Sequence, residues 1–277
     1  MTKIIINGEA VTTLSSTDRA VQYGDGLFET LAVYHRQIEC WPQHLARMQR
    51  GCLQLGLPII DAPTWLADIA KLELNDHCVV KLIQSRGSSG RGYVYTDAIQ
   101  STRIVSTTNW PEYPQHTAQQ GIIMRSCQTP ASVNVALAGI KHLNRLDNVL
   151  ARNEWHDKNI AEGLMYDADG NVIEGTMSNL FAVKSAVLYT PDLQRAGVQG
   201  VIRDLIMAIA AGQGVQVEQC AIKVHDLKEM DEIFMTNSII GIWPVIGLDR
   251  YTYTIGKLTQ SLQHLLQQDL KTHVTPI

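Results

Sequence analysis

The most informative stretch of the chain is Gly139-Ile140-Lys141-His142-Leu143-Asn144-Arg145, in which a lysine follows an apolar run. Further along, Glu174 opens the run Glu174-Gly175-Thr176-Met177-Ser178-Asn179-Leu180. A lysine preceded by Ala136-Leu137-Ala138-Gly139-Ile140 is expected in a poorly solvated site, where the charged form is disfavoured and the neutral amine becomes a nucleophile or base. Lys141 is therefore our candidate for a lysine that forms a Schiff base. The alternative is a solvated surface lysine just before a helix.

A reactive lysine with an acidic partner further along the chain suggests pyridoxal phosphate as the cofactor. This cofactor is bound through a Schiff base, and its pyridinium nitrogen needs an acidic partner to stay protonated and act as an electron sink. Glu174 can be that partner, because it follows a turn and precedes a strand, from whose start its carboxylate could point into a cleft. The alternative is an edge-strand glutamate in solvent.

These residues resemble those of the fold-type IV pyridoxal-phosphate enzymes, which include branched-chain and D-amino acid aminotransferases and 4-amino-4-deoxychorismate lyases. Two stretches make the chain most similar to the lyases, namely residues 140–146 and Ser85-Arg86-Gly87-Ser88-Ser89-Gly90-Arg91-Gly92-Tyr93. The likeness runs from Asp18-Arg19-Ala20 and residues 23–30 to Phe234-Met235-Thr236-Asn237-Ser238. It implies a fold of two α/β (α+β) domains with the cofactor between them, usually in a homodimer.

Composition and charge argue against several other classes of function. The chain has 277 residues, 45% hydrophobic and 18% charged, which suffices for one large domain or two small ones. The net charge is only -4 and the basic residues are scattered, so we expect a small-molecule substrate, with no nucleic acid and no membrane as partner. Five cysteines without a C-x-x-C pair predict neither a disulfide framework nor a metal site. No apolar stretch approaches the ~18–20 residues of a membrane span or suggests a signal peptide, so we expect a cytoplasmic protein.

The order of predicted elements indicates two α/β units. We expect an N-terminal domain over residues 1–109, a linker over 110–120 and a C-terminal cofactor-binding domain over 121–277. The linker is placed at Trp110-Pro111-Glu112-Tyr113-Pro114, because proline interrupts both helices and interior strands. The Asn7-Gly8 dipeptide predicts a first hairpin. Strands are predicted at 3–6, 10–13, 28–34, 37–40, 78–84, 103–107, 122–126, 163–167, 180–183, 187–190, 215–221 and 232–236, and helices after residue 42 and at 63–72, 146–157, 201–212 and 255–269.

The phosphate of the cofactor needs backbone N–H groups, a helix N-terminus and a cation. The segment 198–203 supplies the first two, because it opens a strongly apolar helical pattern whose initial amides are unpaired. The resemblance implies that Val201 and Ile202 offer those amides, that Arg47 is the cation and that Ser238 contributes its hydroxyl. The alternative for Arg47 is a solvated arginine on an amphipathic helix.

Two residues follow Lys141 closely enough to take part in the same site. In the family pattern Asn144 lies beside the cofactor, but the sequence leaves open whether its amide bonds the ring oxygen or a backbone group. His142 is either a base or a packed, hydrogen-bonded histidine.

The glycine-rich stretch 85–93 is the candidate for binding the substrate. It lacks the lysine of a P-loop and the G-x-G-x-x-G spacing of a dinucleotide site, which argues against a nucleotide ligand. The resemblance places Arg91 at a substrate carboxylate with Tyr93 beside it, because a guanidinium fork matches a carboxylate bidentately. The alternative is a glycine-rich hairpin with solvated arginines.

The strand after Gly24-Asp25-Gly26 is a second candidate for substrate contact. Asp25 is expected to fix a tight turn, in which the glycines permit positive φ. Phe28 and Thr30 should share one face of the strand, where Thr30 could touch the substrate. Many lyases of the family have a threonine where this chain has Glu29, which bears on the substrate contacts of this strand.

The resemblance implies conversion of 4-amino-4-deoxychorismate to 4-aminobenzoate and pyruvate, a step of folate synthesis. Lys141 would move the protons, Glu174 would keep the cofactor ring an electron sink, and Arg91 would orient the diacid. An aminodeoxychorismate synthase would then act upstream. The alternative is a D-amino acid or branched-chain amino acid aminotransferase on the same scaffold. The two functions share the cofactor residues and differ only in the residues that bind the substrate. A hypothesis of another class is a noncatalytic pyridoxal-phosphate carrier.

Overall fold

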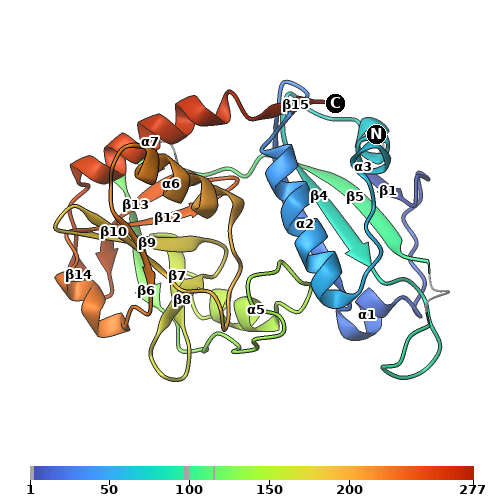
Figure 1. Cartoon of the computed structure of the whole chain (residues 1–277), viewed down its shortest axis with the longest axis horizontal. Coiled ribbons are helices and arrows are strands. Elements are labelled where there is room, and N and C mark those ends of the chain that lie inside the picture. The colour runs from blue at the N-terminus through green and yellow to red at the C-terminus, as the bar shows by residue number, and fades with distance from the viewer. Residues whose placement is uncertain (1–2, 97–99, 115) are drawn as a thin grey trace. The chain divides into compact units, whose positions relative to one another are not determined.

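The computed structural model describes residues 3–96, 100–114 and 116–277 (Figure 1). Parts of the expected N-terminal domain, at 1–2 and 97–99, and position 115 of the expected linker lie outside these residues. The chain divides into two compact units, each with helices and sheet, which confirms the predicted α/β class. Unit 1 comprises Met1–Pro111, Ile140–Asn144 and Lys271–Ile277, and unit 2 comprises Glu112–Gly139 and Arg145–Leu270.

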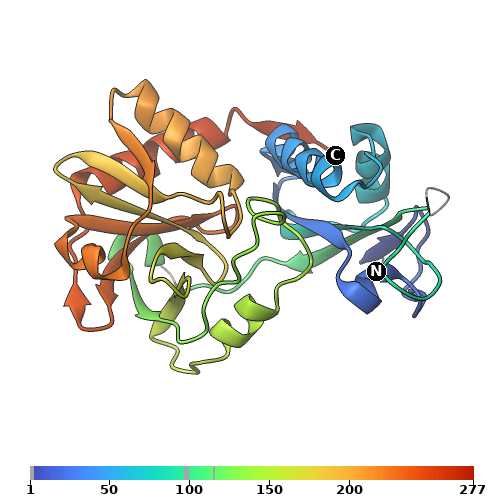
Figure 2. The same ribbon diagram turned by 60° about the horizontal axis from the view of Figure 1, so that its bottom comes forward.

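Unit 1 is built on an antiparallel sheet. Its elements are β1 (Ile4–Ile6), α1 (Arg19–Tyr23), β2 (Gly26–Tyr34), β3 (Gln37–Glu39), α2 (Trp41–Leu55), α3 (Ala62–Ala70), β4 (His77–Ser85), β5 (Thr102–Asn109) and β15 (Val274–Pro276). Within the described residues the strands follow the order β1-β5-β4-β2-β3-β15. Helices α2 and α3 lie over one face of this sheet (Figures 1 and 2).

Helix α2 forms where the sequence predicted it, because its apolar residues recur on one face. Met48 and Cys52 are buried, and the helix ends at Gly56, whose φ of 61° is the left-handed conformation that favours glycine. Gly51 allows a close approach to β2, since a Cβ there would lie 2.8 Å from the Leu27 side chain. The face of β2 that carries Leu27 is therefore the face covered by α2.

The segment Ile140–Asn144 comes from the middle of the chain but belongs to unit 1. The Phe28 amide donates to the Lys141 carbonyl at 2.9 Å, and the Leu143 amide donates to the Gly26 carbonyl at 3.0 Å. The segment thereby extends the sheet beside the start of β2. This backbone pairing sets Lys141 opposite Phe28.

Unit 2 is built on a larger mixed sheet. Its elements are α4 (Thr117–Gln120), β6 (Ile122–Ser126), α5 (Leu146–Arg152), β7 (Ile160–Tyr166), β8 (Val172–Gly175), β9 (Asn179–Lys184), β10 (Val187–Pro191), α6 (Val201–Gly212), β11 (Val217–Cys220), the 3₁₀ helix η1 (Val224–Glu229), β12 (Glu232–Asn237), β13 (Gly241–Leu248), β14 (Tyr251–Thr252) and α7 (Lys257–Leu270). The strand order is β11-β10-β9-β12-β13-β6-β7-β8, with β14 beside β13. Helices α6 and α7 pack against each other and against β12 (Figure 1).

The core of unit 2 lies mainly in the central strands of its sheet. Apolar side chains from β9, β12 and β13 form it, including Leu180, Met235 and Val245, all fully buried. Among the described residues, no helix combines the length and the apolar character needed to cross a bilayer.

The tight turn predicted at Asn7-Gly8 forms, because Ile6 and Glu9 exchange backbone hydrogen bonds at 2.8 and 2.9 Å. The strand predicted at 10–13 is wrong, since the pairing stops at the isolated bridge between Ile6 and Glu9. The Asn7 amide donates to the Arg103 carbonyl at 2.9 Å, and its side-chain oxygen accepts from the Arg103 amide at 2.8 Å. The neighbour of β1 in the sheet is β5.

Candidate functional site

Lys141 lies on the face of the unit 1 sheet that is turned away from α2. Its Nζ is 4.3 Å from the centroid of the Phe28 ring, and the Nζ of Lys81 is 5.0 Å from the same centroid. Thr30 is on this face too, because it lies two residues after Phe28 in β2 and pairs with Lys81 in β4. The face thus combines two amines, an aromatic ring and a hydroxyl, and Lys141 is half-buried there.

The opposite face of β2 carries a buried cluster of charged and polar groups. Both oxygens of Glu29 accept from Arg47, with Nε to Oε1 at 2.8 Å and Nη2 to Oε2 at 2.5 Å. The Nδ1 of His44 lies 2.7 Å from Glu29 Oε2. Glu29 and His44 are each 1% exposed and Arg47 is 5% exposed, so Arg47 is not a solvated helix arginine.

Burial and pairing act in opposite directions on the pKa of Glu29. Burial raises it, but the charge and hydrogen bonds of Arg47 and the hydrogen bond with His44 outweigh burial and hold the pKa of Glu29 at about 2. Burial also lowers the pKa of His44. His44 is therefore neutral at pH 7 and donates its Nδ1 proton to the carboxylate, which leaves Arg47 as the cation of the cluster.

Glu174 is a buried residue at the end of β8 in unit 2, so it is not an edge-strand glutamate in solvent. It is 7% exposed, and its Oε2 accepts from the Val198 amide at 2.8 Å. The Nη1 of Arg145 lies 3.9 Å from Oε1. Gly197, with φ of 80°, packs so closely that a Cβ there would lie 3.2 Å from Oε2. The carboxylate is thus held by the loop that precedes α6.

The start of α6 has the features of an anion site. The preceding loop is fixed by the chain at Gly139, whose amide donates to the Gly197 carbonyl at 2.9 Å and whose carbonyl accepts from Gln199 at 3.0 Å. Gly200 caps the helix without a side-chain hydrogen bond. The amides of Val201 and Ile202 therefore belong to the first turn, where N–H groups have no partner within the helix.

Gly200 packs directly against the side chain of Asn179. A Cβ at this position would overlap the side-chain oxygen of Asn179, whose Nδ2 donates to the Val198 carbonyl at 2.8 Å. The glycine thus permits this close packing at the start of the helix. The first-turn amides of Val201 and Ile202 are the groups that fit a phosphate.

Ser238 lies in the turn between β12 and β13. Asn237 forms this turn, because its Oδ1 accepts from the amides of Ile239 at 2.8 Å and Ile240 at 3.0 Å. Its Nδ2 donates to the Met177 carbonyl at 3.0 Å. The structure therefore ties the Ser238 turn to the run that begins at Glu174.

The side chain of Asn144 bonds one of the two kinds of partner that the sequence left open, a backbone group. Its Nδ2 donates to the Gly24 carbonyl at 3.0 Å. A Cβ on Gly24 would lie 2.8 Å from the Asn144 Oδ1, so the glycine permits this contact. The partner is thus a backbone group of the turn before β2.

Arg91 and Tyr93 lie on an exposed segment without regular secondary structure. Tyr93 is 81% exposed, and Arg91 takes part in none of the ion pairs found among the described residues. The other arginine of the stretch, Arg86, is buried and paired with Asp25. Of these two arginines, Arg91 is the one exposed as a substrate ligand would be.

His44 and Lys81 are not among the residues predicted from the sequence, and Glu29 was predicted only to differ from the family pattern. His44 and Arg47 are one helical turn apart, and this spacing was the available signal that the two side chains share a partner. Lys81 is a charged residue in the middle of an apolar strand, which was the available signal for a polar face of the sheet.

Comparison with known proteins relates the whole chain to one family. Residues 26–248 match the family described as "Amino-transferase class IV". The aminodeoxychorismate lyase of Vibrio harveyi is 34% identical over 263 residues, 93% of this chain and 97% of that protein. The crystal structure of 4-amino-4-deoxychorismate lyase from Pseudomonas aeruginosa superimposes with a TM-score of 0.90 and 40% identity, covering 96% of this chain and 99% of that one. A hypothetical aminotransferase from Mycobacterium tuberculosis, in its PLP-bound form, has the same fold, with a TM-score of 0.83, 19% identity and coverage of 98% of this chain and 99% of that one.

Proposed function

The chain belongs to the class IV aminotransferase family, and on that basis we propose that it is a pyridoxal-phosphate-dependent lyase. The reaction is the conversion of 4-amino-4-deoxychorismate to 4-aminobenzoate and pyruvate, a step of folate synthesis. The observation that carries the proposal is the likeness to two aminodeoxychorismate lyases, at 34% and 40% identity over nearly the whole chain.

We propose pyridoxal phosphate as the cofactor. In unit 1, Lys141 would bond its aldehyde carbon, and Asn144 would fix the turn beside it. Arg47, which pairs with Glu29 on the α2 face of β2, would be the cation for its phosphate. In unit 2, Glu174 partners its ring nitrogen. The backbone amides of Val201 and Ile202 and the hydroxyl of Ser238 would also bind the phosphate. The buried carboxylate of Glu174 and the first-turn amides of α6 support this assignment.

The protein's own residues carry the proton transfers and the orientation of the substrate. The bound cofactor supplies an electron sink for the substrate's amine-bearing carbon. Lys141 Nζ removes the proton from that carbon and later protonates the departing enolpyruvyl fragment. Glu174 keeps the ring nitrogen protonated, while Arg91 with Tyr93 binds a carboxylate of the diacid and Thr30 contacts the substrate. Formation of the aromatic ring drives the reaction.

The alternative is a D-amino acid or branched-chain amino acid aminotransferase. It is favoured by one observation, the buried Glu29 at the position where many lyases of the family have threonine. The Glu29 side chain is on the α2 face of β2, whereas Thr30 is on the Lys141 face. Glu29 pairs with Arg47, the proposed cation for the phosphate, so this difference concerns the cofactor and not the substrate side that separates the two reactions.

We further propose that the enzyme is a cytoplasmic homodimer that receives its substrate from an aminodeoxychorismate synthase. An apolar surface on α5 supports the dimer, since Leu146, Val149 and Leu150 are 70%, 52% and 55% exposed. The five cysteines, all without a disulfide, agree with the cytoplasm.

The test of the function is a coupled assay with chorismate, glutamine and an aminodeoxychorismate synthase. We expect 4-aminobenzoate from the wild type and a loss of several orders of magnitude in Lys141→Ala, because the nucleophile and the proton carrier vanish together. Borohydride treatment of the wild type should attach the cofactor to the peptide containing Lys141. A label on Lys158 or Lys184, or a tenth of the activity in Lys141→Ala, would contradict the assignment.

A further inference from the structure

We propose that Arg19 is a positioning residue, which holds the segment 89–95 in the conformation that presents Arg91 and Tyr93 to the substrate. The part of the proposal that concerns the substrate rests on the proposed function of Arg91. The part that concerns the segment rests on contacts within unit 1 alone.

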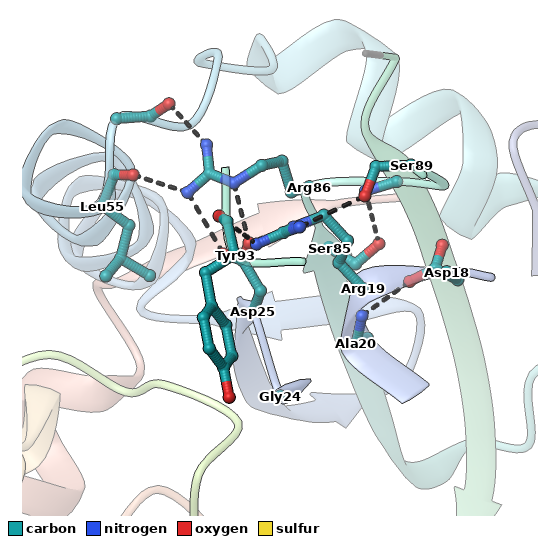
Figure 3. Close-up of polar contacts among 12 residues, drawn as sticks. Asp18, Arg19, Ala20, Gly24, Asp25, Leu55, Ser85, Arg86, Ser89 and Tyr93 are labelled. Atoms are coloured by element: carbon teal, nitrogen blue, oxygen red, sulfur yellow. Dashed lines mark hydrogen bonds and ion pairs between the residues drawn. The ribbon is translucent and has the colours of Figure 1, made fainter. Parts of the chain in front are cut away.

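The guanidinium of Arg19 donates hydrogen bonds to two backbone carbonyls and one side chain of the segment 89–95. Its Nη1 donates to the Gly92 carbonyl at 3.0 Å and to the Ser89 hydroxyl at 3.2 Å, and its Nη2 donates to the Tyr93 carbonyl at 3.0 Å (Figure 3). Arg19 itself is only 4% exposed. An exposed segment usually satisfies its carbonyls with water, whereas here one buried guanidinium binds the two carbonyls that follow Arg91.

Asp25 fixes the guanidinium of Arg19. Its Oδ2 accepts from Arg19 Nε at 2.7 Å and from Arg86 Nε at 2.8 Å, and its Oδ1 accepts from Arg86 Nη2 at 3.1 Å. Burial raises the pKa of Asp25, but the hydrogen bonds and charges of Arg86 and Arg19 outweigh burial and lower it. The carboxylate therefore stays ionised and holds both guanidinium groups in place.

Arg86 connects this cluster to the end of α2. Its Nη2 donates to the Leu55 carbonyl at 2.7 Å and its Nη1 to the Gly56 carbonyl at 2.9 Å (Figure 3). Its Cζ lies 3.7 Å from the centroid of the Tyr95 ring, a stacked cation–π geometry. The segment is thus held at 92–93 by Arg19 and at Tyr95 by Arg86, and both arginines are anchored on regular structure.

This role requires the geometry of arginine. Arg19 uses Nε for Asp25 and both terminal nitrogens for the segment, which a planar fork with five N–H donors can do. A lysine keeps the charge for Asp25 but has one nitrogen on a flexible stem, so it cannot bind all three acceptors in this arrangement. Arg19→Lys therefore separates the hold on the segment from the ion pair.

The first experiment measures how often the segment opens. Folded protein is digested with a protease specific for arginyl bonds, and cleavage at Arg91–Gly92 is followed by mass spectrometry. Loss of one or two hydrogen bonds in Arg19→Lys should speed this cleavage about tenfold, because cleavage follows the population of the open segment. The matched control is Arg103→Lys, which alters an ion pair with Asp68 of similar geometry, 2.9 Å between Nε and Oδ2. It should be cleaved at the wild-type rate.

The second experiment measures whether loosening of the segment 89–95 changes substrate binding. We expect KM for 4-amino-4-deoxychorismate to rise about tenfold in Arg19→Lys, with kcat within about twofold and the absorption spectrum of the bound cofactor unchanged. Wild-type cleavage of a folded Arg19→Lys, or an unchanged KM, overturns the proposal.

If Arg19→Lys does not fold, Asp25→Asn serves in its place, because it weakens the hold on both guanidinium groups and should speed cleavage at Arg91 as well. Arg91→Ala tests the proposed function separately. It should lower kcat/KM about thirty- to a thousandfold, since a lost bidentate ion contact costs roughly 2–4 kcal/mol. An unchanged kcat/KM there contradicts the substrate role of Arg91 and leaves the hold on the segment to be decided by the cleavage rates.

Discussion

At the scale of single residues, the site depends on how buried charges are paired. Lys141 and Glu174 could be named from the sequence, because each opens or centres a family motif. The pairing of Glu29 with Arg47 and His44 could not, since it joins a strand to a helix and the spacing of the two helix residues does not say which residue they share. Such a pair is expensive to break, because removal of one partner leaves an uncompensated buried charge.

The pH dependence of stability should reveal Glu29. Its pKa is lowered from about 4.5 to about 2 on folding, so its contribution is complete above about pH 4.5 and is lost as the pH falls toward 2. Between pH 7 and pH 3 this amounts to about 2 kcal/mol of the free energy of unfolding. Urea unfolding at the two pH values should show that Glu29→Gln, although less stable at pH 7, lacks this part of the acid sensitivity. An identical pH dependence in variant and wild type would contradict the pairing.

Arg47 should be needed to retain the cofactor. Arg47→Ala removes a charge-assisted contact with the phosphate, which costs on the order of 1.5–3 kcal/mol of binding free energy. It also leaves Glu29 as an unpaired buried charge, so the variant should be less stable, and the affinity of the folded protein is the quantity to compare. Excess pyridoxal phosphate should restore much of the activity of the folded variant. The control is Arg50→Ala, an exposed arginine on the same helix, which should bind the cofactor like the wild type. Equilibrium dialysis against pyridoxal phosphate measures the cofactor affinity of each variant. Equal affinity in Arg47→Ala and Arg50→Ala would remove Arg47 from the phosphate site.

At the scale of elements, periodicity located most helices and strands, because amphipathic patterns follow from burial of one face. It failed where tertiary pairing overrides local preference. The strand predicted at 10–13 does not form after the turn at Asn7-Gly8, and β1 pairs with β5 instead. The predicted helix 146–157 ends at Arg152, where the side chain of Asn153 bonds the Val149 carbonyl at 2.7 Å. Strand β13 was not predicted, because Pro244 in its middle is a residue that argues against an interior strand.

Gly200 should be essential to the start of α6. Gly200→Ala places a Cβ on the Asn179 side chain, so we expect a loss of roughly 1–3 kcal/mol in stability together with weaker cofactor binding. The matched control is Gly212→Ala at the other end of the helix, where a Cβ meets nothing within 4 Å. That variant should be unchanged or more stable by up to about 1 kcal/mol. Thermal unfolding and cofactor titration of both variants test this, and equal behaviour would contradict the close packing at Gly200.

At the scale of the whole molecule, the class of fold could be predicted because the family motifs run in order along the chain. Which residues belong to each of the two units could not be derived in this way. Residues 140–144 group with unit 1 through two backbone hydrogen bonds to β2, and residues 271–277 return to the same unit as its last strand, β15. Hydrogen bonds of such long sequence separation leave no periodic signal in either partner.

A lyase and an aminotransferase differ in the products that they form without a keto acid acceptor, so the ratio of these products distinguishes the two functions. Wild-type protein, supplied with 4-amino-4-deoxychorismate and no keto acid, should release 4-aminobenzoate and pyruvate in equal amounts over many turnovers. An aminotransferase would stop after one half-reaction, because it needs an acceptor to regenerate the cofactor. Turnover of D-alanine or a branched-chain amino acid that depends on 2-oxoglutarate and far exceeds 4-aminobenzoate formation would contradict the lyase and establish the aminotransferase.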